Sequence, residues 1–214
     1  MRNKFFLILF VALVLGGAVL VLFWNVVRAT ISGNAPVVAK TETVTRTLEE
    51  PNVTFIDQIV GPKDASITIV EFGDYLCPHC RTAELAVQRL LAEQPTRVRY
   101  VWKDMPAPLH EGADTAAEAG LCAAQQGAFW KFHEVLFSYS GSFNETSLAF
   151  EAGQNGLDMQ SFAECLRTHA TRPFVERTVD EGLALGVDAL PTFFINGKRH
   201  VGALTYEELL EAVR

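Results

Sequence analysis

Cys77 and Cys80 are the residues whose type and spacing most directly indicate chemistry, because they lie two residues apart and enclose Pro78 and His79. A pair at this spacing can bind a metal, form a structural disulfide or carry out thiol–disulfide exchange. Zinc requires more ligands than one such pair, and haem attachment requires a histidine where this chain has Arg81. A disulfide across two residues closes a very short loop and stabilises little. The pattern therefore favours redox activity, with no metal and no cofactor.

The direction of the redox reaction follows from the position of Cys77. Proline is favoured at the first position of a helix, so Pro78 places Cys77 at or next to the N-cap. The unpaired N–H groups and the positive end of the helix dipole favour a thiolate there, and His79 adds a further positive group. Since a stabilised thiolate stabilises the dithiol, the Cys77–Cys80 disulfide is readily passed to another protein. The sequence predicts a disulfide donor.

Two acidic residues lie close to this pair in the sequence. Cys80 and Glu84 fall on one otherwise apolar helical stripe, and Glu71 belongs to the preceding segment. Cys80 is expected to be a shielded resolving thiol. Buried carboxyl groups beside it are candidates for a proton relay, so Glu71 and Glu84 are the relay candidates. The alternative is a rotated helix that leaves Glu84 in solvent, and Glu71 likewise takes no part in proton transfer.

The surrounding sequence predicts an α/β domain. Residues 67–72 are β-branched and bounded by turn residues, a helix follows from Pro78, and residues 98–102 form a second strand, most simply in a parallel right-handed crossover. A helical insert is expected at about 109–185. Near the C-terminus Asn196-Gly197 is a strong hairpin signal between two short strands. The cysteine pair then lies where a strand ends and a helix begins, which is where open α/β sheets place their chemistry.

The N-terminal part differs in composition from the rest. The 20 residues from Phe5 to Trp24 are apolar and uncharged, which is enough for a helix to span a bilayer. We expect residues 1–28 to comprise a cytoplasmic start and a transmembrane signal anchor, with a cleaved signal peptide as the alternative. Residues 29–50 form a polar tether and residues 51–214 the folded domain. The charges flanking the apolar run place that domain outside the cytoplasm, in the periplasm or at the cell surface.

The remaining two cysteines, Cys122 and Cys165, both fall in the helical insert. An exported domain permits disulfides, so we expect a structural disulfide between them. The alternative is two buried free thiols that act as small hydrophobic residues. The formal net charge of −7 argues against nucleic acid as a partner.

Four segments together resemble one known family. They read VEFGDYLCPHC, AAEAGLCAAQQGAFWKFHEVLF, FAECL and GVDALPTFFING, and they resemble the DsbA-type thiol:disulfide oxidoreductases of the thioredoxin superfamily from about Ile56 onward. The resemblance implies a thioredoxin fold, with a mixed central sheet and a helical insertion. It also implies that Cys77 is the nucleophile, that Cys80 is its partner, and that Glu71 and Glu84 match the buried acids of the family.

The resemblance further implies that Pro191 is cis, with the Leu190–Pro191 segment against the sulfurs and offering backbone groups to an extended substrate. Independently, a proline that opens a strand indicates a sheet edge. Leu190 stands where the family often has Thr or Val, which affects partner preference.

The expected function is therefore an extracytoplasmic oxidoreductase that donates the Cys77–Cys80 disulfide. Its partners are reduced exported proteins, the membrane through the N-terminal helix, and a membrane protein that reoxidises it by passing electrons to quinone, as the family implies. Two alternatives stay open: a reductase or isomerase that uses the same site, and a non-catalytic module that binds extended peptides.

Overall fold

The computed structural model describes residues 19–28 and 48–214. The chain divides into two compact units, residues 1–44 and 45–214. Residues 19–28 are helical. The predicted anchor and tether fall mostly outside the described residues. No helix in the described ranges is both long enough and apolar enough to cross a bilayer.

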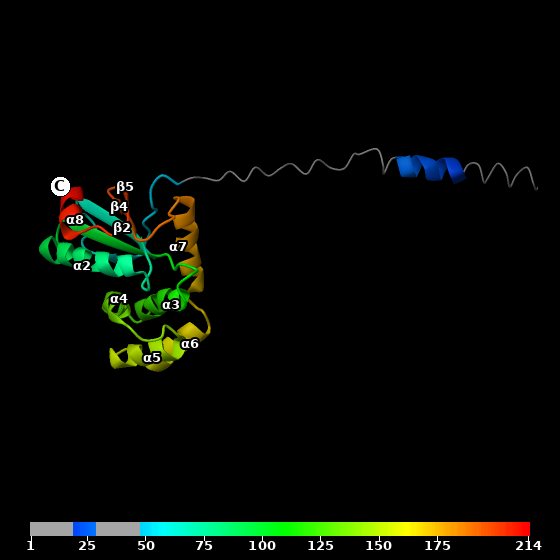
Figure 1. Ribbon diagram of the computed structural model, residues 1–214. Helices are drawn as coiled ribbons and strands as arrows, with labels where there is room; N and C mark the ends of the chain where they lie inside the picture. The colour runs from blue at the N-terminus through cyan, green and yellow to red at the C-terminus, as the bar shows by residue number, and fades with distance from the viewer. Residues whose placement is uncertain (1–18, 29–47) are drawn as a thin grey trace, which may run out of the picture. The chain divides into compact units, whose positions relative to one another are not determined.

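A five-stranded mixed sheet forms the centre of the second unit, in the order β1-β3-β2-β4-β5 (Figure 1). β2 and β3 are parallel, and the other neighbouring pairs are antiparallel. The strands are β1 (Gln58–Val60), β2 (Ile67–Gly73), β3 (Val98–Asp104), β4 (Thr192–Ile195) and β5 (Lys198–Val201). The short edge strand β1 was not among the predicted elements.

The strand–helix–strand unit that carries the cysteines is confirmed. α2 (Pro78–Glu93) follows β2 and leads into β3, which pairs with β2 in parallel register from Ile67↔Val98 to Gly73↔Asp104. The buried residues of α2 are the predicted stripe: Cys80, Ala83, Glu84, Val87 and Leu90. The carboxyl ends of both parallel strands therefore lie beside the start of α2.

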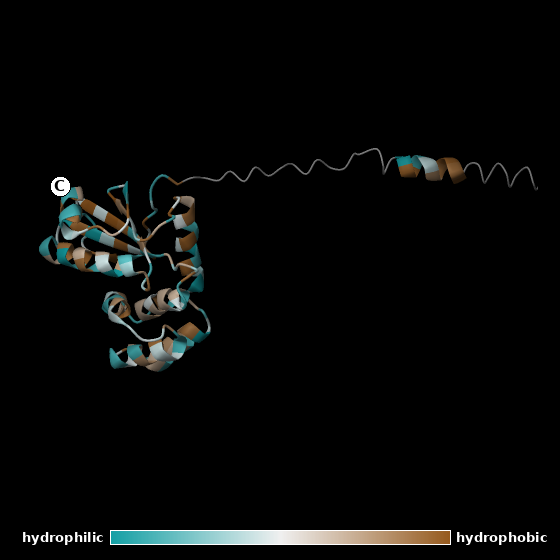
Figure 2. Ribbon diagram, viewed as in Figure 1, coloured by the Kyte–Doolittle hydropathy of each residue, from teal (hydrophilic) through white to brown (hydrophobic). Residues whose placement is uncertain are grey.

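The two faces of the sheet are buried against different helices. Alternate strand residues such as Ile69, Tyr100 and Phe193 belong to the larger apolar cluster, together with side chains of α2, α8 (Tyr206–Ala212) and the helical insert. The intervening residues, such as Phe72 and Phe194, belong to a smaller cluster with residues that follow α7 (Arg172–Ala184). Figure 2 shows the hydrophobic colouring of the central strands. The strand period of two assigns each side chain to one face.

The helical insert comprises four helices: α3 (Ala113–Ala124), α4 (Phe129–Ser138), α5 (Glu145–Gln154) and α6 (Met159–Arg167). Asp158 caps α6 by accepting from Ser161 N. The Cys122–Cys165 disulfide is present and joins α3 to α6, so this prediction is confirmed.

We expect the double variant Cys122→Ala/Cys165→Ala to be less stable by about 2–4 kcal/mol, because the disulfide closes a loop of 43 residues and restricts the unfolded chain. Urea denaturation of the two proteins measures this difference. A midpoint equal to that of the wild type would show that the helices α3 and α6 do not depend on the disulfide.

The C-terminal hairpin forms as predicted, and a short helix, α8, follows it. Asn196 and Gly197 both have positive φ (47° and 81°) in the turn between β4 and β5. α8 begins with the capping box of Thr205 and Glu208. The prediction of a sheet edge at Pro191 is wrong, because β4 lies between β2 and β5. The pairing of β4 begins at Thr192, one residue later, so the missing N–H of the proline interrupts no ladder bond.

A buried ion cluster attaches the start of the domain to the α7 face of the sheet. Lys103 Nζ is fully buried and donates to Asp57 Oδ1 (3.0 Å), Glu181 Oε2 (2.8 Å) and the carbonyl of Asn52 (2.9 Å). Arg177 also pairs with Asp57 at 3.1 Å. Leu48 N donates to the carbonyl of Ala184 at the end of α7. Residues 48–57 are thereby held against β3 and α7.

Candidate active site

Cys77 and Cys80 lie at the start of α2, as predicted. Cys77 is the N-cap residue and Pro78 opens the helix, while Cys80 lies one turn further on, fully buried. Cys77 is 6% exposed, and both cysteines are free thiols, so the structure has the dithiol form of the pair. Pro78 and His79 are exposed. The two sulfurs thus sit at the positive end of the helix, with the exposed tip of the motif beside them.

The Leu190–Pro191 segment lies against Cys77, and its peptide bond is cis, as the resemblance implied. The thiol of Cys77 donates to the carbonyl of Leu190 at 3.9 Å. An open groove of ≈ 320 Å³ adjoins both residues. Its lining comprises Cys77, Met105, Pro106, Ala107, Pro108, His110, Val187, Asp188, Ala189 and Leu190. Leu109, between the lining residues Pro108 and His110, is 95% exposed.

Cys80 and Glu71 form a buried pair under the site. Burial raises the pKa of the Cys80 thiol well above its ordinary value, and the nearby Glu71 carboxylate raises it further. Burial also raises the pKa of Glu71, with Glu84 as the second cause. Tyr100 donates to Glu71 Oε2 at 2.8 Å, while Oε1 has no hydrogen-bond partner among the described residues. A negative charge on any one of these groups therefore disfavours charge on the others.

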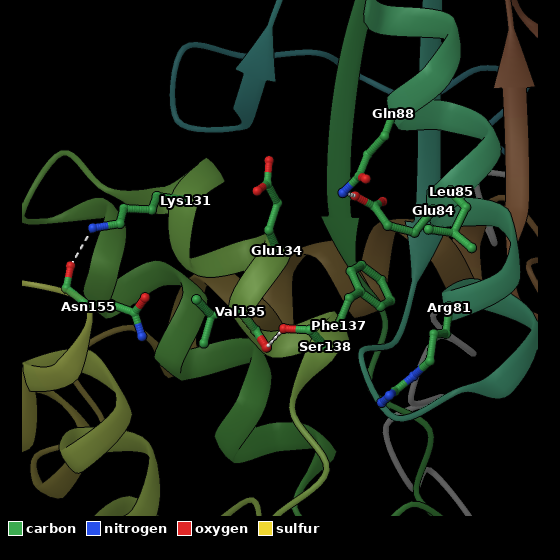
Figure 3. Close-up of a pocket in the computed structure, with 10 residues that line it drawn as sticks. All are labelled: Arg81, Glu84, Leu85, Gln88, Lys131, Glu134, Val135, Phe137, Ser138 and Asn155. Carbon is green, nitrogen blue, oxygen red and sulfur yellow. Dashed lines mark hydrogen bonds between the residues drawn. The ribbon is translucent and has the colours of Figure 1, made fainter.

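Glu84 is also buried, so the alternative of a solvated side chain is wrong. It accepts from Gln88 at 2.9 Å and contacts His133 Nε2 of α4 at 3.3 Å, and His133 Nδ1 lies 2.9 Å from the Tyr75 hydroxyl. Glu84 and Gln88 form one wall of a larger hollow of ≈ 520 Å³ between α2 and α4 (Figure 3). That hollow is lined by neither sulfur. Glu84 thus connects the helical insert to the base of the redox site.

A second group of polar residues, not predicted from the sequence, lies at the carboxyl ends of the parallel strands. Asp74 follows β2, and Asp104 ends β3 opposite Gly73. Asp104 accepts from the indole of Trp102 at 2.8 Å. A Cβ on Gly73 would lie 2.4 Å from the Trp102 ring, so only glycine permits this packing. The signal was available, since polar residues after adjacent parallel strands meet at one edge of the sheet.

Burial raises the pKa of Asp104 to about 7, against the hydrogen bond from Trp102 and with a smaller contribution from Asp74. The folded state therefore holds this proton more tightly than the unfolded state. Stability from this group is fully present below the unfolded value near 4 and is lost as the pH rises through about 7.

At pH 8 we expect the free energy of unfolding of Asp104→Asn to exceed that of the wild type by roughly a few kcal/mol. The amide keeps the acceptor for the Trp102 indole and carries no buried charge. At pH 4 the two proteins should unfold alike. Denaturation midpoints at the two pH values test this, and a stability difference that does not change with pH would contradict it.

Comparison with known proteins agrees with this architecture. Residues 55–214 match the thioredoxin family. A thioredoxin-like oxidoreductase from Silicibacter pomeroyi DSS-3 is 32% identical, with a TM-score of 0.68 over 75% of this chain and 91% of the other. The thiol-disulfide exchange protein alpha-DsbA2 from Wolbachia pipientis shares the fold at 23% identity, with a TM-score of 0.66 over 74% of this chain and 86% of the other.

A curated relative of different length also matches. The Na(+)/H(+) antiporter NhaA 1 of Salinispora arenicola (strain CNS-205) is 39% identical over 158 residues, which cover 73% of this chain and 24% of the antiporter. The chain spans about a quarter of the length of the curated antiporters that it matches.

The mixed sheet, the helical insert and the cysteine pair at the start of α2 define a thioredoxin-fold domain whose two free thiols are placed for thiol–disulfide exchange. With three quarters of its length matched, the chain belongs to the thioredoxin family. The thioredoxin family and fold implied by the resemblance are confirmed.

Proposed function

We propose that the protein donates the Cys77–Cys80 disulfide to reduced exported proteins. The observation that carries this proposal is the position of Cys77 at the N-cap of α2, with its sulfur facing the Leu190 carbonyl and an apolar groove. In general, a cysteine pair at the start of a helix favours the dithiol over the disulfide, and a disulfide of that kind is an oxidant. The groove and the carbonyl of Leu190 provide apolar and hydrogen-bonding contacts for an extended peptide.

The reaction begins when a substrate thiolate attacks the sulfur of Cys77. The Cys77–Cys80 bond breaks, a mixed disulfide forms between the substrate and Cys77, and the electron pair leaves on Cys80. A second substrate thiolate then attacks the substrate sulfur and releases Cys77 as a thiolate. The substrate has lost two electrons and the protein has gained them.

Glu71 and Glu84 are proposed to deliver the proton that Cys80 requires. Burial raises the pKa of the Cys80 thiol, so its thiolate is unstable and takes up a proton as it leaves. Glu71 is the charged group that acts most strongly on this sulfur, and Glu84 acts on Glu71. Glu84 in turn lines the hollow between α2 and α4, which gives it access to solvent.

Reoxidation requires a partner that removes two electrons from the dithiol. We propose a membrane protein that passes them to quinone, and we propose that the apolar run 5–24 anchors the chain so that the domain works outside the cytoplasm. Anchoring would keep the domain close both to that partner and to newly exported chains.

The test is to measure the equilibrium between the isolated domain, residues 45–214, and glutathione, together with the oxidation of a reduced test protein by the pre-oxidised domain. We expect an oxidising potential and stoichiometric disulfide transfer. A strongly reducing potential would instead support the reductase or isomerase. A disulfide that is inert to dithiols would support the peptide-binding module.

A further inference from the structure

Asp74 connects both active-site cysteines to the wall of the groove. Its backbone N–H donates to the sulfur of Cys80 (3.4 Å), and its carbonyl accepts from the N–H of Cys77 (3.1 Å). Its buried carboxylate accepts from Leu76 N (2.8 Å) through Oδ1 and from Ala107 N (3.0 Å) through Oδ2. The same Oδ2 accepts from Nδ1 of His110 at 2.5 Å. Every polar atom of Asp74 is thus used at this site.

His110 is fixed by this contact and faces the groove. It lines the groove together with Cys77 and Leu190, and its side chain is 31% exposed. Because the proton on Nδ1 is directed at Asp74, the other ring nitrogen, Nε2, is left as an acceptor. Nε2 makes no hydrogen bond to any residue within 48–214. An oriented imidazole with a free acceptor nitrogen therefore borders the space in which a substrate thiol meets Cys77.

We propose that His110, held by Asp74, is the base that takes the proton from the incoming substrate thiol. This inference rests on the proposed function. The substrate S–H bond breaks and its proton moves to Nε2, the freed electron pair forms the bond to Cys77, and the Cys77–Cys80 bond breaks with its electron pair on Cys80. The imidazolium is stabilised by the Asp74 carboxylate and returns its proton to solvent through the exposed edge of the ring.

The chemistry of the groove explains why a base is needed there. A cysteine thiol ionises near pH 8.5, so most substrate thiols are protonated at neutral pH, whereas only the thiolate attacks a disulfide. The lining is largely apolar (Met105, Pro106, Leu190), which further disfavours an ionised thiol.

Other charged or titratable groups face His110 as well. Besides Asp74 they are Cys77 at the N-cap of α2 and Asp188 of the loop before Pro191, which line the same groove. Asp188 is mostly exposed and pairs with Arg199, so it competes little for the imidazole.

The experiment compares the wild-type domain with His110→Asn, both oxidised at Cys77–Cys80, in their reaction with a reduced cysteine-containing peptide from pH 6 to 9. Asparagine places an N–H where Nδ1 was, so the contact with Asp74 is kept while the base is lost. We expect the second-order rate of the variant to fall about tenfold at pH 6.5 and by less than about twofold at pH 9, where the thiol ionises unaided. His200→Asn on β5, outside the groove, is the matched control and should follow the wild type.

Each outcome has a distinct meaning. A rate loss that grows as the pH falls supports the base. A loss that is the same at every pH, with an unchanged unfolding midpoint, means a structural role for His110 and overturns the inference. Equal rates for the two proteins overturn it as well. If the wild type itself does not oxidise the peptide, the proposed function fails, and that result is distinguishable because it does not depend on the variant.

Discussion

The Cys77→Ala variant is expected to oxidise no reduced test protein, with activity lost to the background rate. Cys77 is the sulfur that faces the groove, whereas Cys80 is fully buried beneath it. Removing Cys77 therefore removes both the disulfide and the only one of the two sulfurs that lines the groove. The assay starts from a reduced reporter protein that is active only when its own disulfides have formed, and it measures how much reporter activity returns.

The Cys80→Ala variant should behave differently, since it keeps the accessible sulfur and lacks the resolving one. We expect it to accumulate mixed disulfides with substrates. On a non-reducing gel these appear as additional bands that disappear when the sample is reduced. Cys122→Ala/Cys165→Ala is the matched control, because it removes two cysteines and leaves the redox pair, and it should oxidise the reporter while it remains folded. Full activity in Cys77→Ala would end the proposal that this pair donates its disulfide.

The largest stability effect is expected from Lys103→Met. Methionine fills a similar volume, but it removes the ammonium that pairs with both Glu181 and Asp57, and Asp57 then keeps its pair with Arg177. Breaking a buried ion pair by removing one partner costs about 3–5 kcal/mol, because the remaining charge is uncompensated. Chemical denaturation monitored by Trp fluorescence gives this difference.

The control for this prediction is Lys131→Met on the exposed side of α4, where the ammonium donates to the carbonyl of Asn155. A change within about 0.5 kcal/mol is expected for such a surface position. A loss of stability in Lys103→Met no greater than in Lys131→Met would show that the cluster makes no net contribution to folding.

The parts of the fold that could be predicted from sequence are those with local signals. Pro78 marked the start of α2, Asn196-Gly197 marked the hairpin, and the apolar spacing in α2 placed Cys80 and Glu84 on its buried face. These signals act over a few residues and survive in any tertiary context. β1 has only three residues, too short to show a period.

The parts that could not be predicted depend on tertiary placement. Asp74 and His110 come from segments 36 residues apart, and His133 reaches Glu84 from a helix 49 residues away. Only the parallel pairing of β2 and β3 and the docking of α4 bring these groups together. The burial of Lys103 could not be predicted from the sequence either, because a lysine within a strand usually faces solvent. In the structure three partners from two other segments surround its ammonium.

The attachment of residues 48–57 to β3 and α7 has a mechanical consequence. Lys103 and Asp104 are consecutive in β3, so their side chains point to opposite faces of the sheet: one binds the entering chain, and the other lies among the redox-site residues. Tension applied to the chain ahead of Leu48 would first load the ion pairs and α7. The same load would also reach the groove beside Cys77 through residues 187–190, which follow α7 and line that groove.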